Sequence, residues 1–201
     1  MIKRNLLVMG LAVLLSACGF QLRGTGTTEL AIKELDLSAR NAYGETVTQL
    51  RQVLQSSGVK VYTGAPYKLI LTDEQESQRI LSYAGAGRTG EYQVTTVLNY
   101  DIRGEHNLAL MSDKLEVQKI FIHDGNNLVG SDQEAATARA ETRRELVQRM
   151  MLRLQQITPV QLEKLQQTAN NRAKAEADAL NAAQKAEAET PRQSPVEIPQ
   201  Q

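Results

Sequence analysis

The stretch Tyr92-Gln93-Val94-Thr95-Thr96-Val97-Leu98-Asn99-Tyr100-Asp101-Ile102-Arg103 decides the fold, because it has the most regular alternation in the chain. Apolar residues and threonine occupy every second position, polar residues fill most positions between them, and Val97 is the exception. A period of two residues predicts a β-strand with one buried face and one face in water. The domain is therefore expected to contain a sheet that is covered on one side only.

The chain on the C-terminal side of this strand predicts a hairpin. Gly104 to Asn107 supplies the turn, and a fourth strand is expected over about Leu108 to Ile122. The apolar parity of that strand slips between Ser112 and Leu115, which predicts a bulge or break at this point.

The chain on the N-terminal side predicts a crossover unit. Leu30 to Leu37 is expected to form the first strand, and Tyr67 to Leu71 the second. Between them, Val47, Leu50, Val53 and Leu54 recur at helical spacing, and Gly58 is placed to end that helix. A strand, helix and strand in this order predict a right-handed connection.

A final helix is predicted from Ser131-Asp132-Gln133-Glu134, which has the S-x-x-E spacing of a capping box. The second half of the helix carries one apolar face, made of Leu146, Val147, Met150, Met151, Leu154 and Ile157. The first turns carry Arg139 and Arg143 between alanines, so they are expected to project beyond the sheet. These arginines either extend into solvent or contact a partner or an anionic ligand.

These elements predict an α+β fold, a two-layer α/β sandwich of order β-α-β-β-β-α, with two helices packed on one face of a four-stranded mixed sheet. The domain is expected to span residues 30–157. Residues 158–201 are rich in Ala, Gln and Glu and then in Pro, with few large apolar residues. We expect a frayed or solvated helix that passes into disorder, and a partner-binding role for this tail is the alternative.

The N-terminus predicts a lipoprotein signal peptide. Lys3 and Arg4 precede an apolar stretch, Leu6 to Leu15, that is too short to span a bilayer. It ends in Leu15-Ser16-Ala17-Cys18, which resembles the lipobox of bacterial lipoproteins, and Cys18 is the only cysteine in the chain. Residues 1–17 are expected to be removed, Cys18 to carry the covalent lipid, and residues 18–29 to form a tether.

The residue after the cysteine bears on localisation. Gly19 follows Cys18, whereas Asp at this position resembles an inner-membrane retention signal. We therefore expect the protein on the periplasmic side of the outer membrane, held there by its lipid anchor.

The charge balance excludes one class of partner. Residues 1–17 contain two basic residues and no acidic one, so the mature chain has 21 basic against 23 acidic residues and a net charge of −2. Nucleic-acid-binding domains are clearly basic, so no nucleic-acid partner is predicted.

Enzymatic motifs are scarce. Gly85 to Gly90 matches G-x-G-x-x-G, but a strand follows it instead of the helix that a dinucleotide site needs, so a flexible connection with Arg88 at its tip is predicted. His106 and His123 have no Cys, Asp or Glu at metal-ligand spacing. We predict a non-enzyme without metal or cofactor other than the lipid on Cys18.

Three segments carry a family resemblance: Cys18-Gly19-Phe20-Gln21-Leu22-Arg23-Gly24, Glu91-Tyr92-Gln93, and Leu152-Arg153-Leu154. Over about Cys18 to Ile157 the chain resembles the LptE family, lipoprotein subunits of the lipopolysaccharide translocon. The resemblance implies a domain lodged as a plug in the LptD β-barrel, as a 1:1 heterodimer. It also implies roles in assembling that barrel and delivering lipopolysaccharide to the outer leaflet.

Direct contact with lipopolysaccharide, which the resemblance also implies, requires cations against phosphates. The candidate contacts with lipopolysaccharide or the barrel are Arg88, Arg103, Lys114, Lys119, Arg139 and Arg143. The alternative is that they are ordinary solvated charges. The segment His123 to Asn127 has no Lys or Arg, which argues against a strong lipopolysaccharide site at that end.

A general periplasmic scaffold lipoprotein that acts through its C-terminal helical tract is the alternative function. Truncation at Thr158 separates the two, because only the scaffold requires the tract.

Overall fold

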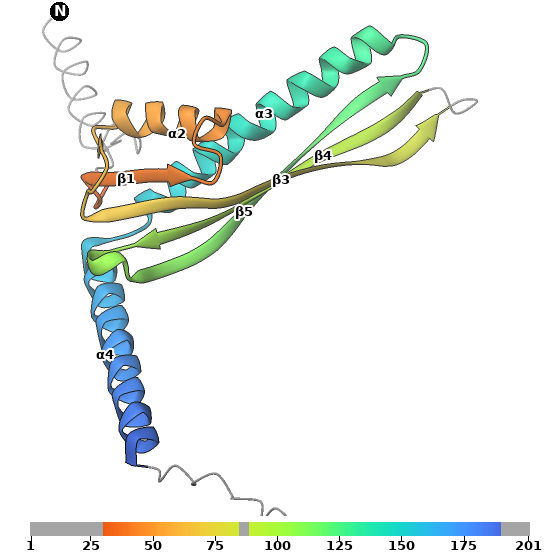
Figure 1. Ribbon diagram of the computed structural model, residues 1–201. Helices are drawn as coiled ribbons and strands as arrows, with labels where there is room; N and C mark the ends of the chain where they lie inside the picture. The colour runs from red at the N-terminus through yellow and green to blue at the C-terminus, as the bar shows by residue number, and fades with distance from the viewer. Residues whose placement is uncertain (1–29, 85–88, 190–201) are drawn as a thin grey trace, which may run out of the picture.

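The computed structural model describes residues 30–84 and 89–189. Its elements are β1 (Glu34–Ala39), α2 (Glu45–Ser56), β2 (Lys60–Val61), β3 (Tyr67–Ala84), β4 (Thr89–Arg103), the 3-10 turn η1 (Glu105–Asn107), β5 (Ala109–Asp124), α3 (Leu128–Gln155) and α4 (Pro159–Glu189). The strands form one mixed sheet of order β2-β1-β3-β4-β5, in which β1 is parallel to β2 and β3. Helices α2 and α3 lie on the same side of this sheet (Figure 1).

The predicted α+β class is confirmed, whereas the predicted strand count of four was too low. The additional strand is β2, whose two residues, Lys60 and Val61, pair with β1 at its edge. A strand of two residues cannot display an alternation, so the sequence pattern could not reveal it.

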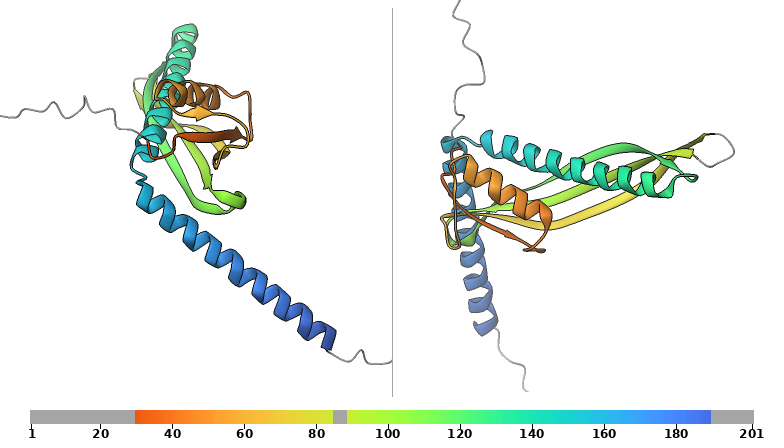
Figure 2. Two further views of the ribbon diagram at one scale, coloured as in Figure 1. Left: turned by 90° about the vertical axis from the view of Figure 1, so that its left-hand side faces the viewer. Right: turned by 90° about the horizontal axis from the view of Figure 1, so that it is seen from above.

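Strands β3, β4 and β5 reach far beyond β1. The pairing of β1 with β3 ends at Ala39 opposite Leu71, but β3 continues to Ala84. The second predicted strand therefore ended too early, because the residues after Leu71 are mostly polar. We call residues 72–84, 89–99 and 114–124 the extension, and the first half of α3 runs along it (Figure 2).

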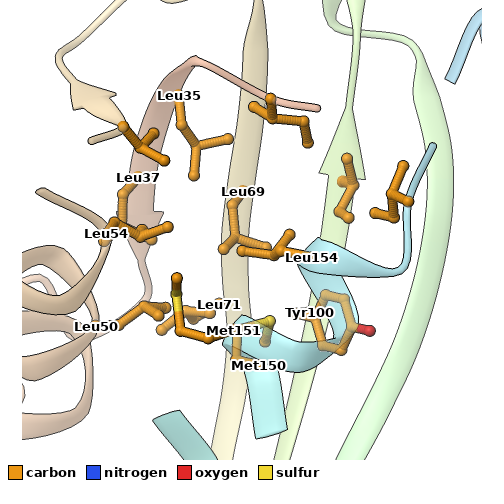
Figure 3. Packing of buried hydrophobic residues seen from close by; sticks show 14 of the residues in the cluster. Leu35, Leu37, Leu50, Leu54, Leu69, Leu71, Tyr100, Met150, Met151 and Leu154 are labelled. Atoms are coloured by element: carbon orange, nitrogen blue, oxygen red, sulfur yellow. The ribbon is translucent and has the colours of Figure 1, made fainter. Parts of the chain in front are cut away.

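The core has two parts. The main cluster joins the proximal end of the sheet, where β1 pairs with β3, to α2 and the second half of α3. Its members Leu50, Leu69, Ile102 and Leu146 are each at most 1% exposed. Figure 3 shows leucines of β1, β3 and α2 facing Met150 and Leu154. A smaller cluster between the extension and the first half of α3 contains Val94, Phe121, Ala135 and Ala138. Its alanines let α3 lie close to the strands, so the first turns of α3 are packed against the extension rather than projecting beyond the sheet.

Helix α3 begins earlier than predicted. Asn127 is the N-cap, and its side-chain oxygen accepts a hydrogen bond from the N–H of Gly130 at 3.0 Å. Ser131 lies inside the helix, is 3% exposed, and bonds both backbone groups of Asp124. The predicted capping box was therefore wrong, because Ser131 fixes the helix to the end of β5.

The irregularity in β5 lies nearer its start than predicted. Ile102 pairs with Met111 and Arg103 pairs with Ala109, so Leu110 is the extra residue. Pairing is regular through Ser112 to Leu115. The parity slip in the sequence arises because Asp113, although charged, shares a face with Met111 and Leu115, where Arg153 pairs with it.

Helix α4 has a defined start. The hydroxyl of Thr158 accepts from the N–H of Gln161 at 3.2 Å, and the Gln161 side chain accepts from the N–H of Thr158 at 3.0 Å. Leu162 and Ala169 are buried in the main core, with Leu165 packed against it. The core thus extends past Ile157, the predicted end of the domain. Residues 1–29 and 190–201, with the predicted signal peptide, tether and Pro-rich end, lie outside the described residues.

Candidate functional site

The face of the sheet opposite α3 is polar over much of the extension. Alternate residues of β4 point to this face, and their neighbours on β3 and β5 do the same. A chain of side-chain hydrogen bonds crosses all three strands: Arg79 Nε donates to Gln93 at 2.7 Å, Gln93 to Gln118, and Gln118 to Glu116 at 2.6 Å. Gln93 is only 5% exposed within this ladder. The sequence prediction of a wet second face agrees with this arrangement.

The end of the extension farthest from β1, here called its distal end, exposes apolar side chains. They come from β3, β5 and the first turn of α3, and are between 40% and 83% exposed: Ile80, Leu81, Tyr83, Ile120, Ile122, Leu128 and Val129. We call these seven residues the apolar tip. Scattered exposed apolar residues are normal, whereas a concentration at one end indicates an interaction site. The alternation of β4 gave no signal for it, because these residues lie on the neighbouring elements.

Two predicted candidate cations of α3 make internal contacts. Arg139 Nε lies 2.7 Å from a carboxylate oxygen of Glu76, and its terminal nitrogen donates to Gln78 at 3.2 Å. Arg143 pairs with Glu45 of α2. The two arginines therefore connect α3 to β3 and α2, and neither points freely into solvent.

The other candidates lie at separate places. Lys119 pairs with Glu145 of α3 at 3.2 Å and holds the pKa of that carboxyl below its ordinary value. Arg103 pairs with Asp101 at 3.5 Å, on the open face near the proximal end. Lys114 is exposed and forms no ion pair with any residue that the structure describes. Arg88 and Cys18 lie outside the described residues.

One charged pair was missed. Arg153 of α3 binds Asp113 of β5, which holds the pKa of the Asp113 carboxyl below its ordinary value. Tyr100 lies close by, and burial raises the pKa of its hydroxyl. The signal for this pair was the charged residue at a core-facing position of β5.

The two histidines lie apart from each other, and their surroundings do not indicate a catalytic or metal-binding role. The ring of His123 lies 4.9 Å from that of Tyr92, and His106 occupies the turn η1. Within residues 30–84 and 89–189, no group of His, Cys, Asp and Glu could hold a metal ion. No helix in this part of the chain combines the length and apolarity needed to cross a membrane.

A comparison with family models gives a match to residues 32–154, under the description "LptE: Lipopolysaccharide-assembly". The chain belongs to the LptE family. The match runs from just before β1 to the end of α3, and the predicted family resemblance is confirmed. As an LptE family lipoprotein, this chain takes part in lipopolysaccharide assembly.

Curated relatives of this LptE family member agree. It is 30% identical over 155 residues to the LPS-assembly lipoprotein LptE of Pectobacterium atrosepticum. This alignment covers 74% of this chain and 83% of the relative. It is also 29% identical over 184 residues to the LPS-assembly lipoprotein LptE of Yersinia pestis. This alignment covers 89% of this chain and 86% of the relative.

Solved structures share the fold. A rare lipoprotein B from Shewanella oneidensis has a TM-score of 0.55 at 20% identity and covers 60% of this LptE family chain and 92% of its own. A lipoprotein B from Nitrosomonas europaea has a TM-score of 0.56 at 21% identity. The match covers 69% of this chain and 89% of the Nitrosomonas chain.

Proposed function

We propose that this LptE family member is an outer-membrane lipoprotein, acylated at Cys18, that lodges in the lumen of an LptD-like β-barrel as a 1:1 heterodimer. There it would assist assembly of the barrel and the transport of lipopolysaccharide to the outer leaflet. The observation that carries the proposal is the extension, a slender three-stranded sheet with one face uncovered and polar.

The open face suits a barrel lumen because such lumens are polar and contain water. The 13 residues of β3 in the extension, Thr72 to Ala84, span about 40 Å at ~3.3 Å per residue. The apolar band of an outer-membrane barrel is about 25 Å tall. The extension is therefore long enough to pass through the lumen, with the apolar tip as its leading end.

Co-purification tests the partner. The tagged, acylated chain is isolated from detergent-solubilised outer membrane, and a large β-barrel is expected in equal amount. Recovery without a barrel would contradict the proposal.

The surface can be tested in the same preparation. Ile120→Asp with Ile122→Asp places charges on the apolar tip and is expected to reduce barrel recovery roughly tenfold. Leu152→Asp is the matched control, because Leu152 is 57% exposed on α3, away from the tip. Equal losses in both variants would indicate general destabilisation instead of a tip contact.

Among the predicted cations, Lys114 is the described residue that we propose for direct contact with lipopolysaccharide. Its ammonium forms no ion pair with a carboxylate in residues 30–84 and 89–189, whereas Arg103, Lys119, Arg139 and Arg143 are paired. Lys114→Gln should weaken binding of purified lipopolysaccharide, whereas Lys174→Gln on α4 should not. Unchanged binding in Lys114→Gln would exclude this contact.

The alternative, a scaffold that acts through the C-terminal tract, retains one supporting observation: α4 is a capped, continuous helix whose second half is exposed. Truncation after Asn171 keeps the packed first turns and removes the exposed part. Normal barrel assembly and normal exclusion of large antibiotics are expected in this variant. Loss of either would favour the scaffold.

A further inference from the structure

The first turns of α4 form a groove with the C-terminal end of α3 and the start of β5. The groove has a volume of about 500 Å³ and is lined by Met111, Arg153, Gln156, Ile157, Gln161, Lys164, Leu165 and Thr168. Small-molecule sites commonly have volumes of about 300–1,000 Å³. Half of the lining residues belong to α4, which begins beyond residue 154, where the match to the family model ends.

The lining combines an apolar floor with positive charge. Met111, Ile157 and Leu165 supply the floor, Arg153 and Lys164 supply the charge, and no carboxylate lines the groove. Arg153 is already neutralised by Asp113. Lys164 is exposed and forms no ion pair with the described residues, so it is the cation available to a ligand.

The sequence of α4 shows how far the positive side of the groove extends. Residues three and four apart share one side of a helix, and the groove-lining side carries Gln161, Lys164, Leu165 and Thr168. The next positions on that side include Arg172, Ala175 and Glu176, one basic and one acidic residue, so the unpaired positive charge on this side is that of Lys164 in the groove. A ligand with an apolar chain and an anionic head matches the groove.

We propose that the groove binds one anionic phospholipid from the membrane that holds the protein, with an acyl chain on Met111, Ile157 and Leu165 and the phosphate at Lys164. The choice of a membrane lipid rests on the proposed anchoring at Cys18, but it does not depend on the barrel. Helix α4 leaves the domain at the end where β1 begins (Figure 1). A tether of ten residues, Gly19 to Thr28, reaches at most about 33–36 Å, which keeps this end close to the membrane surface.

Methionine methyl groups offer a site-specific measurement. After removal of residues 1–17 the chain keeps three of its five methionines: Met111 in the groove, and Met150 and Met151 in the main core. The mature acylated protein, methyl-labelled at methionine, is placed in nanodiscs of phosphatidylcholine with an increasing fraction of phosphatidylglycerol. The methyl resonance of Met111 is expected to shift in a saturable way, while those of Met150 and Met151 stay constant.

Two variants decide the role of the charge. Lys164→Gln should raise the phosphatidylglycerol fraction at half-saturation roughly tenfold, as expected for the loss of one charge-assisted contact. Lys174→Gln, on the opposite side of α4, should leave it unchanged. Unchanged resonances of Met150 and Met151 in Lys164→Gln confirm that the fold is intact.

Four outcomes would overturn the proposal: a Met111 resonance that does not respond, an equal response in pure phosphatidylcholine, the same shift with inorganic phosphate alone, or equal effects of the two lysine variants. Because no barrel is present, failure here leaves the barrel proposal standing. A failed co-purification with the barrel likewise leaves this measurement interpretable.

Discussion

The side-chain oxygen of Gln166 on α4 accepts a hydrogen bond from the backbone N–H of Glu105 at 3.1 Å. Glu105 opens the turn between β4 and β5, in which His106 and Asn107 adopt φ values of 58° and 60°. A side chain at Gly104 would collide with Gln166, so the glycine permits this close approach. The start of α4 is therefore joined to the β4–β5 hairpin as part of the domain.

Truncation after Thr158 should therefore destabilise the protein, whereas truncation after Asn171 should not. The shorter chain loses the packing of Leu162 and Leu165, and a buried leucine contributes about 1.5–3 kcal/mol. We expect a loss on the order of 4 kcal/mol for the shorter chain and under about 0.5 kcal/mol for the longer one. Urea unfolding of the acyl-free proteins measures both. Equal midpoints would show that α4 does not contribute to the core.

The fold could be predicted wherever one face of an element is buried and the other is in water. Strand β4 meets that condition, since Val94, Leu98 and Tyr100 face α3 and the alternate residues face solvent. The distal half of β3 does not, because Glu76 and Gln78 point towards α3 and bind Arg139. Polar residues on both faces leave no alternation, although the strand continues to Ala84.

Ser131→Ala is expected to destabilise the protein, and Glu134→Ala to have little effect. The hydroxyl of Ser131 accepts from the N–H of Asp124 at 2.7 Å and donates to its carbonyl oxygen at 3.1 Å. Removing it takes the acceptor from the part-buried N–H of Asp124, at a cost of about 1–2 kcal/mol, whereas the carbonyl oxygen of Asp124 still accepts from the N–H of Asn127. Glu134 is exposed and makes no cap, so we expect a change under about 0.5 kcal/mol. A larger cost for Glu134→Ala would support the predicted capping box.

The candidate site was predictable in its residue types but not in its pairings. Arg139 and Arg143 stood out as cations on an otherwise small-residue face of α3. Their carboxylate partners, Glu76 and Glu45, are far away in sequence and meet them only through the packing of α3. Asp113 was visible as a break in parity, but the sequence alone could not distinguish a charged pair from a bulge.

Replacement of Asp113 by Asn should lower the free energy of unfolding at neutral pH. In acid the same replacement should have no effect on stability. Arg153 lowers the pKa of the folded-state carboxyl below its ordinary value of 3.8. The pair therefore stabilises the fold above pH 3.8, and this contribution is lost as the pH falls through the lower folded-state pKa. Both side chains are partly exposed, so we expect about 0.2–1 kcal/mol.

This pH dependence can be tested by measuring the unfolding free energies of the wild type and Asp113→Asn across this pH range. Asp132→Asn is the control, because Asp132 is an exposed carboxylate of α3 without an ion pair among the described residues. A stability difference that grows as the pH falls would contradict the assigned role of Arg153.

Gly90→Ala should loosen the apolar tip while leaving the main core intact. A Cβ at Gly90 would lie 2.7 Å from the carbonyl oxygen of Ser82 on β3, and 3.5 Å from the rings of Tyr83 and Tyr92. The backbone of β3 must therefore move, at a cost of about 1–3 kcal/mol. The smaller core cluster of Val94 and its neighbours is separate from the main one, so the disturbance should remain in the extension.

Amide hydrogen exchange can locate this effect. Exchange in the distal parts of β3 and β4 should become faster in Gly90→Ala, while exchange in β1 and in the second half of α3 should not change. Thr95→Ala, on the open face of β4, controls for the loss of strand propensity alone. If Gly90→Ala also accelerates exchange in β1, the two clusters unfold as one unit. In that case any effect of this variant on barrel recovery could not be assigned to the geometry of the apolar tip.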